Sequence, residues 1–175
     1  MNDTHASTLD LIPFTPALIR MEIDNHAELS MHLNAVIPPE WPPHEVRNLL
    51  DYFAHSLEER SDDSCWRGYY WVASSEEMPR TLVGSGGFKN LPDEAKSVEI
   101  GYGTLEIFRN RGFATRAVKK LVEIAILSTE VEIVIAEALK SNAASIHVLQ
   151  KAGFMCIGNA DEENTLRFRI DVRHH

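Results

Sequence analysis

The chain has 175 residues, of which 44% are apolar and 25% are charged, a composition typical of a globular protein with one domain and a proper core. Its formal net charge of -9 argues against a nucleic-acid partner, because binding a phosphate backbone requires a broad basic surface. No apolar run approaches the roughly 20 residues that span a bilayer, and the polar start MNDTHASTLD lacks the features of a signal peptide, so we expect a cytoplasmic protein without a membrane partner.

The first third of the chain predicts a short strand, two short helices and a stiff loop. The strand spans Leu9–Phe14, and the helical pattern of Ala17–Leu33 has a break at Asp24 and Asn25. Prolines then exclude a helix until Pro43, which suits the first position of one. Apolar residues follow at helical spacing, namely Val46, Leu49, Leu50, Phe53 and Leu57.

Two strands are predicted next, Gly68–Ser74 and Thr81–Phe88, joined by the turn SEEMPR. The second strand ends in the sequence GSGGF. Gly84, Gly86 and Gly87 do not have the G-x-G-x-x-G spacing and no helix follows them, which disfavours a dinucleotide-binding fold.

The stretch from Val98 to Val122 is the part around which we expect the rest of the chain to be organised. It begins with a strand whose side chains alternate between two faces. Val98, Ile100 and Tyr102 point to one face, and Glu99, Gly101 and Gly103 point to the other. One face is therefore predicted to be core, while the other is nearly bare backbone that carries a single carboxylate.

A helix is predicted after this strand, with Gly112 at its start. Its apolar stripe consists of Ala114, Ala117, Val118, Leu121, Val122, Ala125 and Ile126. The first backbone N–H groups of a helix have no internal partner and carry roughly half a positive charge. Side-chain cations lie near the same end, namely Arg109, Arg111, Arg116, Lys119 and Lys120. In an acidic chain this cluster predicts a phosphate site, where Gly112 lets the anion approach the backbone.

The last third predicts a buried strand, a helix and two closing strands. The first strand spans Val131–Ala138, and the helix is capped by Ser141 or Asn142 and ended by Gly153 in a left-handed conformation. The closing strands are Phe154–Ile157 and Asn164–Val172.

Cysteine and histidine give no sign of a metal site. Cys65 and Cys156 lie far apart and fit reduced thiols better than a disulfide framework. The histidines are terminal or scattered over separate predicted elements, so we expect no metal.

The sequence RNRGFA, residues 109–114, fits the pattern Arg/Gln-x-x-Gly-x-Gly/Ala, and SNAASIHVLQKAGF, residues 141–154, opens a helix with Asn and closes it with Gly-Phe. In this order the two motifs resemble those of the GNAT superfamily of acyl-CoA-dependent N-acyltransferases, whose first motif holds the pyrophosphate of coenzyme A. The resemblance covers about residues 82–158. The spacing of Asn142 and Ser145 and the sequence EIGY look most like the branch that contains ribosomal-protein N-terminal acetyltransferases.

This resemblance implies an α/β (α+β) fold with a mixed, mostly antiparallel sheet of about seven strands flanked by about four helices. Residues 1–175 would form a single domain, with acceptor-side elements in 9–65, a cofactor-binding core in 66–158 and C-terminal strands in 154–172. The implied co-substrate is acetyl-CoA. The matched positions that would bind it are Ile100, Gly101, Tyr102, Arg109, Asn110, Arg111, Gly112, Phe113, Ala114, Thr115, Asn142 and Ser145.

The implied reaction is direct attack of a primary amine, on a protein N-terminus or a small molecule, on the thioester. Glu99 is the candidate general base, acting directly or through water; the alternative is an ion-paired or solvated strand residue. Many GNAT enzymes use a Tyr on the later helix as general acid, but the matching residue here is Leu149. Ser145 is the candidate hydrogen-bond donor to the departing thiolate, or else a surface serine that bonds a backbone carbonyl. Asn142 either orients the pantetheine arm or caps the helix.

The acceptor side is less defined. Trp41 either plugs the core or belongs to a loop that walls the acceptor pocket, and we list Trp41 and Glu99 as substrate-binding residues. We expect a monomer or homodimer that acts on a small-molecule or peptide amine. Two other classes stay open, namely an acyl-CoA-binding module without turnover and a regulatory domain that binds a phosphate ligand.

Overall fold

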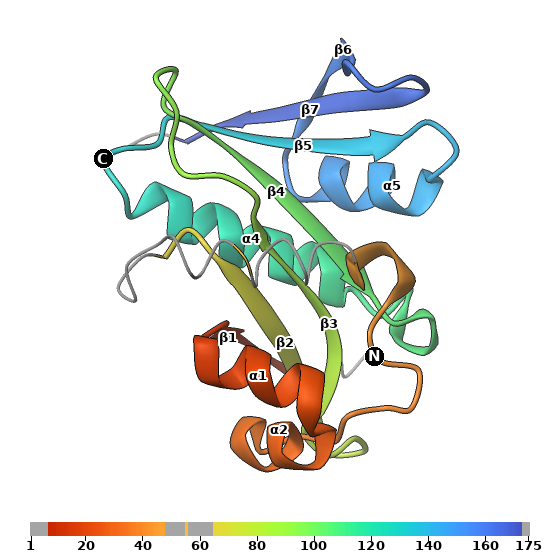
Figure 1. Ribbon diagram of the computed structural model, residues 1–175. Helices are drawn as coiled ribbons and strands as arrows, with labels where there is room; N and C mark the ends of the chain where they lie inside the picture. The colour runs from red at the N-terminus through yellow and green to blue at the C-terminus, as the bar shows by residue number, and fades with distance from the viewer. Residues whose placement is uncertain (1–6, 48–54, 56–64, 173–175) are drawn as a thin grey trace.

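The computed structural model describes residues 7–47, 55 and 65–172. Within these residues the chain forms a seven-stranded sheet in the order β1-β2-β3-β4-β5-β7-β6 (Figure 1). The strands are β1 Thr8–Pro13, β2 Gly68–Ser74, β3 Thr81–Phe88, β4 Ser97–Thr104, β5 Ile133–Leu139, β6 Met155–Asn159 and β7 Thr165–Asp171. Only β4 and β5 pair in parallel, whereas the other neighbours are antiparallel. The expected mixed, mostly antiparallel fold is confirmed.

The helices begin and end at residues whose chemistry explains the boundaries. They are α1 Pro16–Asp24, α2 His26–Leu33, α4 Phe113–Ile126 and α5 Ala143–Lys151, with 3-10 turns η1 His44–Val46 and η2 Glu106–Phe108. Asn25 ends α1 and also caps α2, because its side chain accepts a hydrogen bond from the Glu28 N–H. Gly153 follows α5 and has a φ of +99°, so it adopts the left-handed backbone conformation that was predicted for the residue ending this helix.

One predicted helix can be compared only at its start. The 3-10 turn η1 follows Pro43, the residue expected to begin that helix. Leu49, Leu50, Phe53 and Leu57, which were expected to form its apolar stripe, lie outside the described residues.

Helices on both sides bury the middle of the sheet. Residues 68–73 of β2 and all of β3 are buried, because α1 and α2 cover one face of the sheet and α4 covers the other (Figure 1). The helix α4 packs against β1, β3 and β4 through its apolar stripe.

The strands β4 and β5 separate along their length. Their parallel pairing runs from Ser97 and Ile133 to Ile100 and Ala136. Beyond that point β4 continues to Thr104 beside β3, while β5 continues to Leu139 beside β7. A V-shaped opening therefore forms between the two strands, and in the described sheet the edge of β4 that faces it has no strand partner.

Candidate active site

A pocket of about 360 Å³ lies where the free edge of β4, the start of α4 and one face of α5 meet. This volume is in the range of pockets that bind small molecules. It is lined by Tyr102, Arg109, Asn110, Gly112, Phe113, Ala114, Thr115, Asn142 and Ser145 among the residues expected to bind the cofactor. The two motifs of the sequence, which are far apart along the chain, thus converge on one cavity.

The start of α4 differs from the starts of the other described α-helices. At the starts of α1, α2 and α5, the side chains of Thr15, Asn25 and Asn142, respectively, each accept a hydrogen bond from a backbone N–H group. At α4 the N-cap is Gly112, in a left-handed conformation with φ +77°, and no described side chain caps the helix. A Cβ atom added at Gly112 would meet nothing within 4 Å. The helix start is therefore open toward the pocket, as an anion-binding site requires.

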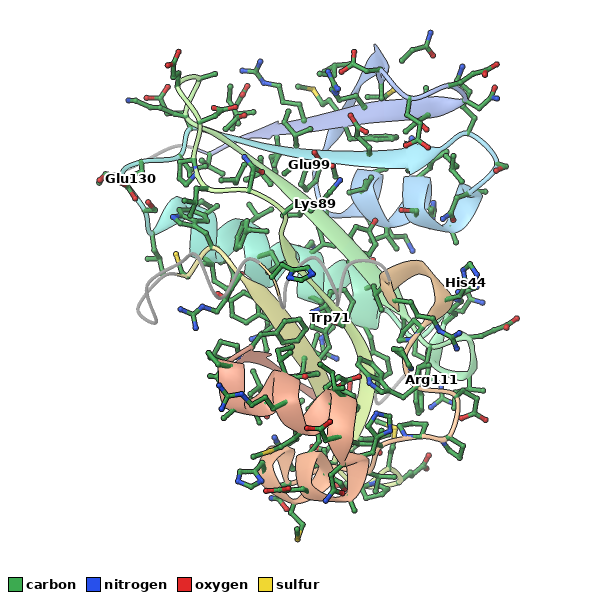
Figure 2. All side chains as sticks on the ribbon, viewed as in Figure 1. His44, Trp71, Lys89, Glu99, Arg111 and Glu130 are labelled. Atoms are coloured by element: carbon green, nitrogen blue, oxygen red, sulfur yellow. The ribbon has the colours of Figure 1, made fainter. Side chains whose placement is uncertain are left out.

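The expected cations are distributed more widely than the sequence suggested. Arg109 lines the pocket, and its Nε donates to the Thr104 carbonyl oxygen at 3.3 Å. Arg111 lies over the ring of Phe108, with its guanidinium carbon 5.6 Å from the ring centroid, and is labelled in Figure 2. Arg116 points elsewhere, because its guanidinium donates to the hydroxyl and the carbonyl of Ser7.

The lysine that lines the pocket also differs from those expected. Lys119 and Lys120 of α4 are exposed and lie outside the pocket lining. Lys151, at the end of α5, lines the pocket instead. Among the described residues, the arginine and lysine side chains that line the pocket are therefore Arg109, which precedes α4, and Lys151 of α5.

Gly103, whose strand face was expected to be nearly bare backbone, also lines the pocket. Further lining residues that the sequence did not indicate are Thr104, Phe108, Ala144, His147, Val148 and Lys151. Those on α5 recur at three- and four-residue spacing from Ala144, so helical periodicity could have revealed them. Ile100, Gly101 and Arg111, which were expected to bind the cofactor, are outside this lining. Their expected role stays a prediction.

Ser145 is held at the pocket by two contacts. Its backbone N–H donates to Asn142 Oδ1 at 3.0 Å, so Asn142 caps α5 and lines the pocket. Its Oγ lies 3.0 Å from the Tyr102 hydroxyl oxygen. Burial raises the pKa of Tyr102 to about 12. Leu149, at the position of the usual GNAT tyrosine, is fully buried.

Glu99 lies outside this lining. Its carboxylate forms an ion pair with Lys89, and both side chains are labelled in Figure 2. The Glu99 backbone N–H donates to Asn90 Oδ1 at 2.6 Å. The ion-paired arrangement that the sequence left open is thus present, and a role as base stays a prediction.

Trp41 lies in a buried polar cluster under α1. It is only 5% exposed, and its Nε1 donates to Glu22 Oε1 at 2.6 Å. Burial is the main cause that raises the pKa of Glu22. Glu22 Oε2 and the Tyr70 hydroxyl oxygen are buried without a hydrogen bond of standard geometry in the described part of the chain. No sequence pattern indicated this cluster.

Two absences hold for the described residues. No group of three or more His, Cys, Asp or Glu side chains among them is arranged to hold a metal ion. None of the described helices has both the length and the apolar composition needed to cross a membrane.

Comparison with known sequences gives two matches along most of the chain. The family model for the acetyltransferase (GNAT) domain matches residues 9–155. The uncharacterized N-acetyltransferase YjdG of Bacillus subtilis (strain 168) is 27% identical over 154 residues, which are 88% of this chain and 87% of that protein.

Solved structures share the fold at low sequence identity. A domain from Methanocaldococcus jannaschii DSM 2661 has a TM-score of 0.63 at 15% identity and covers 95% of this chain and 99% of its own. The spermidine N-acetyltransferase from Vibrio cholerae in complex with CoA and spermine has a TM-score of 0.60 at 14% identity, covering 94% and 95%, respectively. At this identity the likeness concerns the fold alone.

Proposed function

The chain belongs to the GNAT acetyltransferase family, and from this premise we propose that it transfers an acetyl group from acetyl-CoA to the primary amine of a small cationic molecule. The uncapped start of α4, open to a pocket at the free edge of β4, is the observation that carries the proposal. The formal net charge of -9 favours a cationic acceptor over a neutral one. A protein N-terminus is the other acceptor class, which the substrate screen described below separates.

The hydrogen-bond donors at the pocket suit the phosphate groups of coenzyme A. In this proposal the N–H groups from Gly112 to Thr115, together with Arg109, bind the pyrophosphate. The pantetheine arm lies along the free edge of β4, whose backbone from Gly101 to Thr104 has no partner on the β5 side in the described sheet. The co-substrate supplies the activated acetyl group as a thioester.

Proton transfer from the amine is part of the barrier. At neutral pH a lysine-like amine with a pKa of about 10.4 is uncharged in only about one molecule in 2,500. Glu99 is the proposed base and receives this proton through water, since its contact with Lys89 holds the carboxylate beside the strand. The nitrogen then attacks the thioester carbon, the C–N bond forms and the C–S bond breaks. Ser145 donates a hydrogen bond to the departing sulfur.

The division of the chain follows from this arrangement. We assign residues 9–65 to the acceptor side, 66–158 to the cofactor-binding core and 154–172 to the C-terminal strands, all within one domain. Trp41 belongs to the acceptor side through its contact with Glu22. A cytoplasmic location and a monomeric or homodimeric state remain expectations from the sequence.

Thermal unfolding with acetyl-CoA tests the cofactor site. A ligand at about 100 times its Kd stabilises a protein by about 2.7 kcal/mol, which corresponds to a Tm rise of about 5–10 °C for a domain of this size. We expect this rise in the wild type and its loss in Arg109→Glu, which places a negative charge at the pocket. Lys120→Glu is the matched control, because it makes the same charge change at an exposed position of α4 outside the lining. An unchanged Tm of the wild type at saturating acetyl-CoA would contradict the proposal.

Thiol release then tests turnover and acceptor class. The wild type is incubated with acetyl-CoA and a panel of polyamines, single amines and peptides with free N-termini, and free thiol is measured. Release with small cationic amines supports the proposal. Release with peptides alone would move the acceptor to the protein N-terminus, and a Tm rise without any thiol release would identify a binding module.

A further inference from the structure

The glycines at the end of β3 make room for two aromatic rings. A Cβ atom at Gly86 would lie 2.5 Å from the Cβ of Tyr102, and one at Gly84 would lie 2.9 Å from Cε3 of Trp71. Both distances are shorter than carbon atoms tolerate. The sequence GSGG therefore has a structural purpose that its spacing did not reveal, because larger residues would displace Trp71 and Tyr102.

These two rings form a stack across the sheet. Trp71 is paired with Gly84 on β3, and Tyr102 on β4 is paired with Gly86. Since directly paired residues of antiparallel strands point to the same face, both rings lie on one face over the glycines. Their centroids are 6.2 Å apart and their planes are inclined by 27°. Trp71, which is fully buried and labelled in Figure 2, thereby fixes the ring of Tyr102.

The stacked tyrosine directs its hydroxyl to the start of α5. The hydroxyl oxygen lies 3.0 Å from Ser145 Oγ, where either oxygen can be the donor, and the Tyr102 hydroxyl can also donate to the Ser145 carbonyl oxygen at 3.3 Å. Tyr102 and Ser145 both line the pocket. Asn142 holds the backbone of Ser145 from the other side. The Ser145 side chain is thus oriented by Tyr102, a strand residue that lies 43 positions earlier in the chain.

We propose that Tyr102 is a positioning residue, which donates a hydrogen bond to Ser145 Oγ so that the serine O–H is directed at the departing sulfur. This inference rests on the proposed acetyl transfer. It assigns to a strand tyrosine and a helix serine the task for which Leu149 provides no hydroxyl. A hydroxyl whose oxygen accepts a hydrogen bond is itself a stronger donor. Ser145 paired with Tyr102 is therefore a stronger hydrogen-bond donor to the sulfur than an isolated serine.

The proposed step keeps its protons in balance. When the C–S bond breaks, the electron pair goes to the sulfur, which accepts a hydrogen bond from Ser145. Tyr102 and Ser145 both keep their protons, and the sulfur leaves as a thiolate. The nitrogen loses two protons: the one that the ammonium group gives up before attack passes through water to Glu99 and on to solvent, and the one released when the amide forms then follows the same route. Burial raises the pKa of Tyr102 to about 12, so its hydroxyl stays protonated and able to donate throughout the neutral range.

Tyr102→Phe tests the proposal, because phenylalanine keeps the ring that stacks on Trp71 and removes only the hydroxyl. We expect kcat to fall about tenfold, while the KM for acetyl-CoA and the Tm rise with acetyl-CoA stay within twofold of the wild type. Ser145→Ala is expected to reduce kcat about 100-fold. The double variant should match Ser145→Ala alone, because Tyr102 acts through the serine.

The matched control is Tyr69→Phe. Tyr69 lies on the same face, paired with Gly86, but its hydroxyl donates to the Cys65 carbonyl oxygen at 2.7 Å, away from Ser145. This variant should keep full kcat. Wild-type kcat in Tyr102→Phe, or losses that multiply in the double variant, would overturn the proposal. A wild type without thiol release would instead contradict the proposed function, so the two failures are distinguishable.

Discussion

The pocket at the start of α4 and the cluster under α1 contain polar groups in opposite states. At the start of α4, backbone N–H groups that the helix does not use lie at an open pocket beside Gly112. Under α1, the carboxylate of Glu22 and the hydroxyl of Tyr70 interact with each other away from solvent, and each has an oxygen without a hydrogen bond of standard geometry in the described part of the chain. The first region leaves its donors accessible to the anion that we propose there, whereas the second costs free energy wherever a buried oxygen is left without a partner.

This difference has a structural cause. The pocket at the start of α4 forms where strand and helix termini meet, so its hydrogen-bond donors are backbone N–H groups at fixed positions in the fold. The cluster under α1 is made by packing of Trp41 and Tyr70 against Glu22, with the two rings 6.2 Å apart. A ligand site formed by backbone tolerates changes in surrounding side chains, but a site formed by packed side chains does not. We therefore expect variants in the two regions to differ in kind.

The largest effect is expected at Gly86, which packs against the pocket-lining residue Tyr102. In Gly86→Ala the new Cβ would lie 2.6 Å from the Gly101 carbonyl oxygen and 2.7 Å from the Tyr102 Cα, both backbone atoms that cannot move independently. Overpacking of this kind destabilises by about 3 kcal/mol, or a fall in Tm of about 6–12 °C. Denaturant unfolding and a thermal scan measure both quantities.

The neighbouring residue provides the control. Ser85 is buried, and its Oγ donates to the Tyr69 carbonyl oxygen at 3.0 Å. Ser85→Ala loses this hydrogen bond without adding an atom, so its cost should be about 1 kcal/mol. If Gly86→Ala were as stable as Ser85→Ala, the strand would accommodate a side chain and the tight contact with Tyr102 would not limit the fold.

The sequence predicted the parts of this site that depend on neighbours along the chain. The start of α4 after Gly112, the cap of α5 at Asn142 and its end at Gly153 follow from local backbone chemistry, and the structure has all three. The opening between β4 and β5, by contrast, follows from the strand pairing and from no local sequence pattern.

The sequence did not predict contacts between distant segments. Tyr102 was expected to point to the core, and its hydroxyl contact with Ser145 depends on how α5 docks against β4. Glu22 lies in a helix among apolar residues, and nothing in the local pattern distinguishes a buried carboxylate from an exposed one. Both contacts are set by tertiary packing, which periodicity alone does not encode.

A medium effect is expected from restoring the usual tyrosine of the family at position 149. Leu149 is fully buried, so the larger ring of Leu149→Tyr has no free space and should cost about 1–3 kcal/mol. We expect no gain in kcat, because the hydroxyl would enter the core rather than the pocket. Denaturant unfolding and thiol release measure the two outcomes. Leu149→Met, which conserves volume, is the control and should cost less than about 1.5 kcal/mol.

The smallest effect, about 1 kcal/mol, is expected from Glu22→Gln. Glutamine keeps an acceptor for the Trp41 Nε1–H and places an uncharged group opposite the Tyr70 hydroxyl. Burial raises the pKa of Glu22 above its ordinary value of 4.5. A raised pKa in the folded state means that this carboxyl contributes stability below pH 4.5, which is lost as the pH rises through the folded value. The wild type should therefore lose stability relative to Glu22→Gln as the pH rises above 4.5, as measured by urea unfolding at each pH.

Asp24→Asn corrects this measurement for net charge, because it removes a carboxylate from an exposed position of the same helix.

Glu22→Gln also tests whether the cluster under α1 contacts the acceptor amine. If Glu22 is only a packing residue, Glu22→Gln leaves the KM for the amine and the Tm rise with acetyl-CoA unchanged. A higher KM for cationic amines at an unchanged Tm rise would instead show that the sealed carboxylate is reached by the acceptor. The closed region would then be a second binding site, open only during turnover.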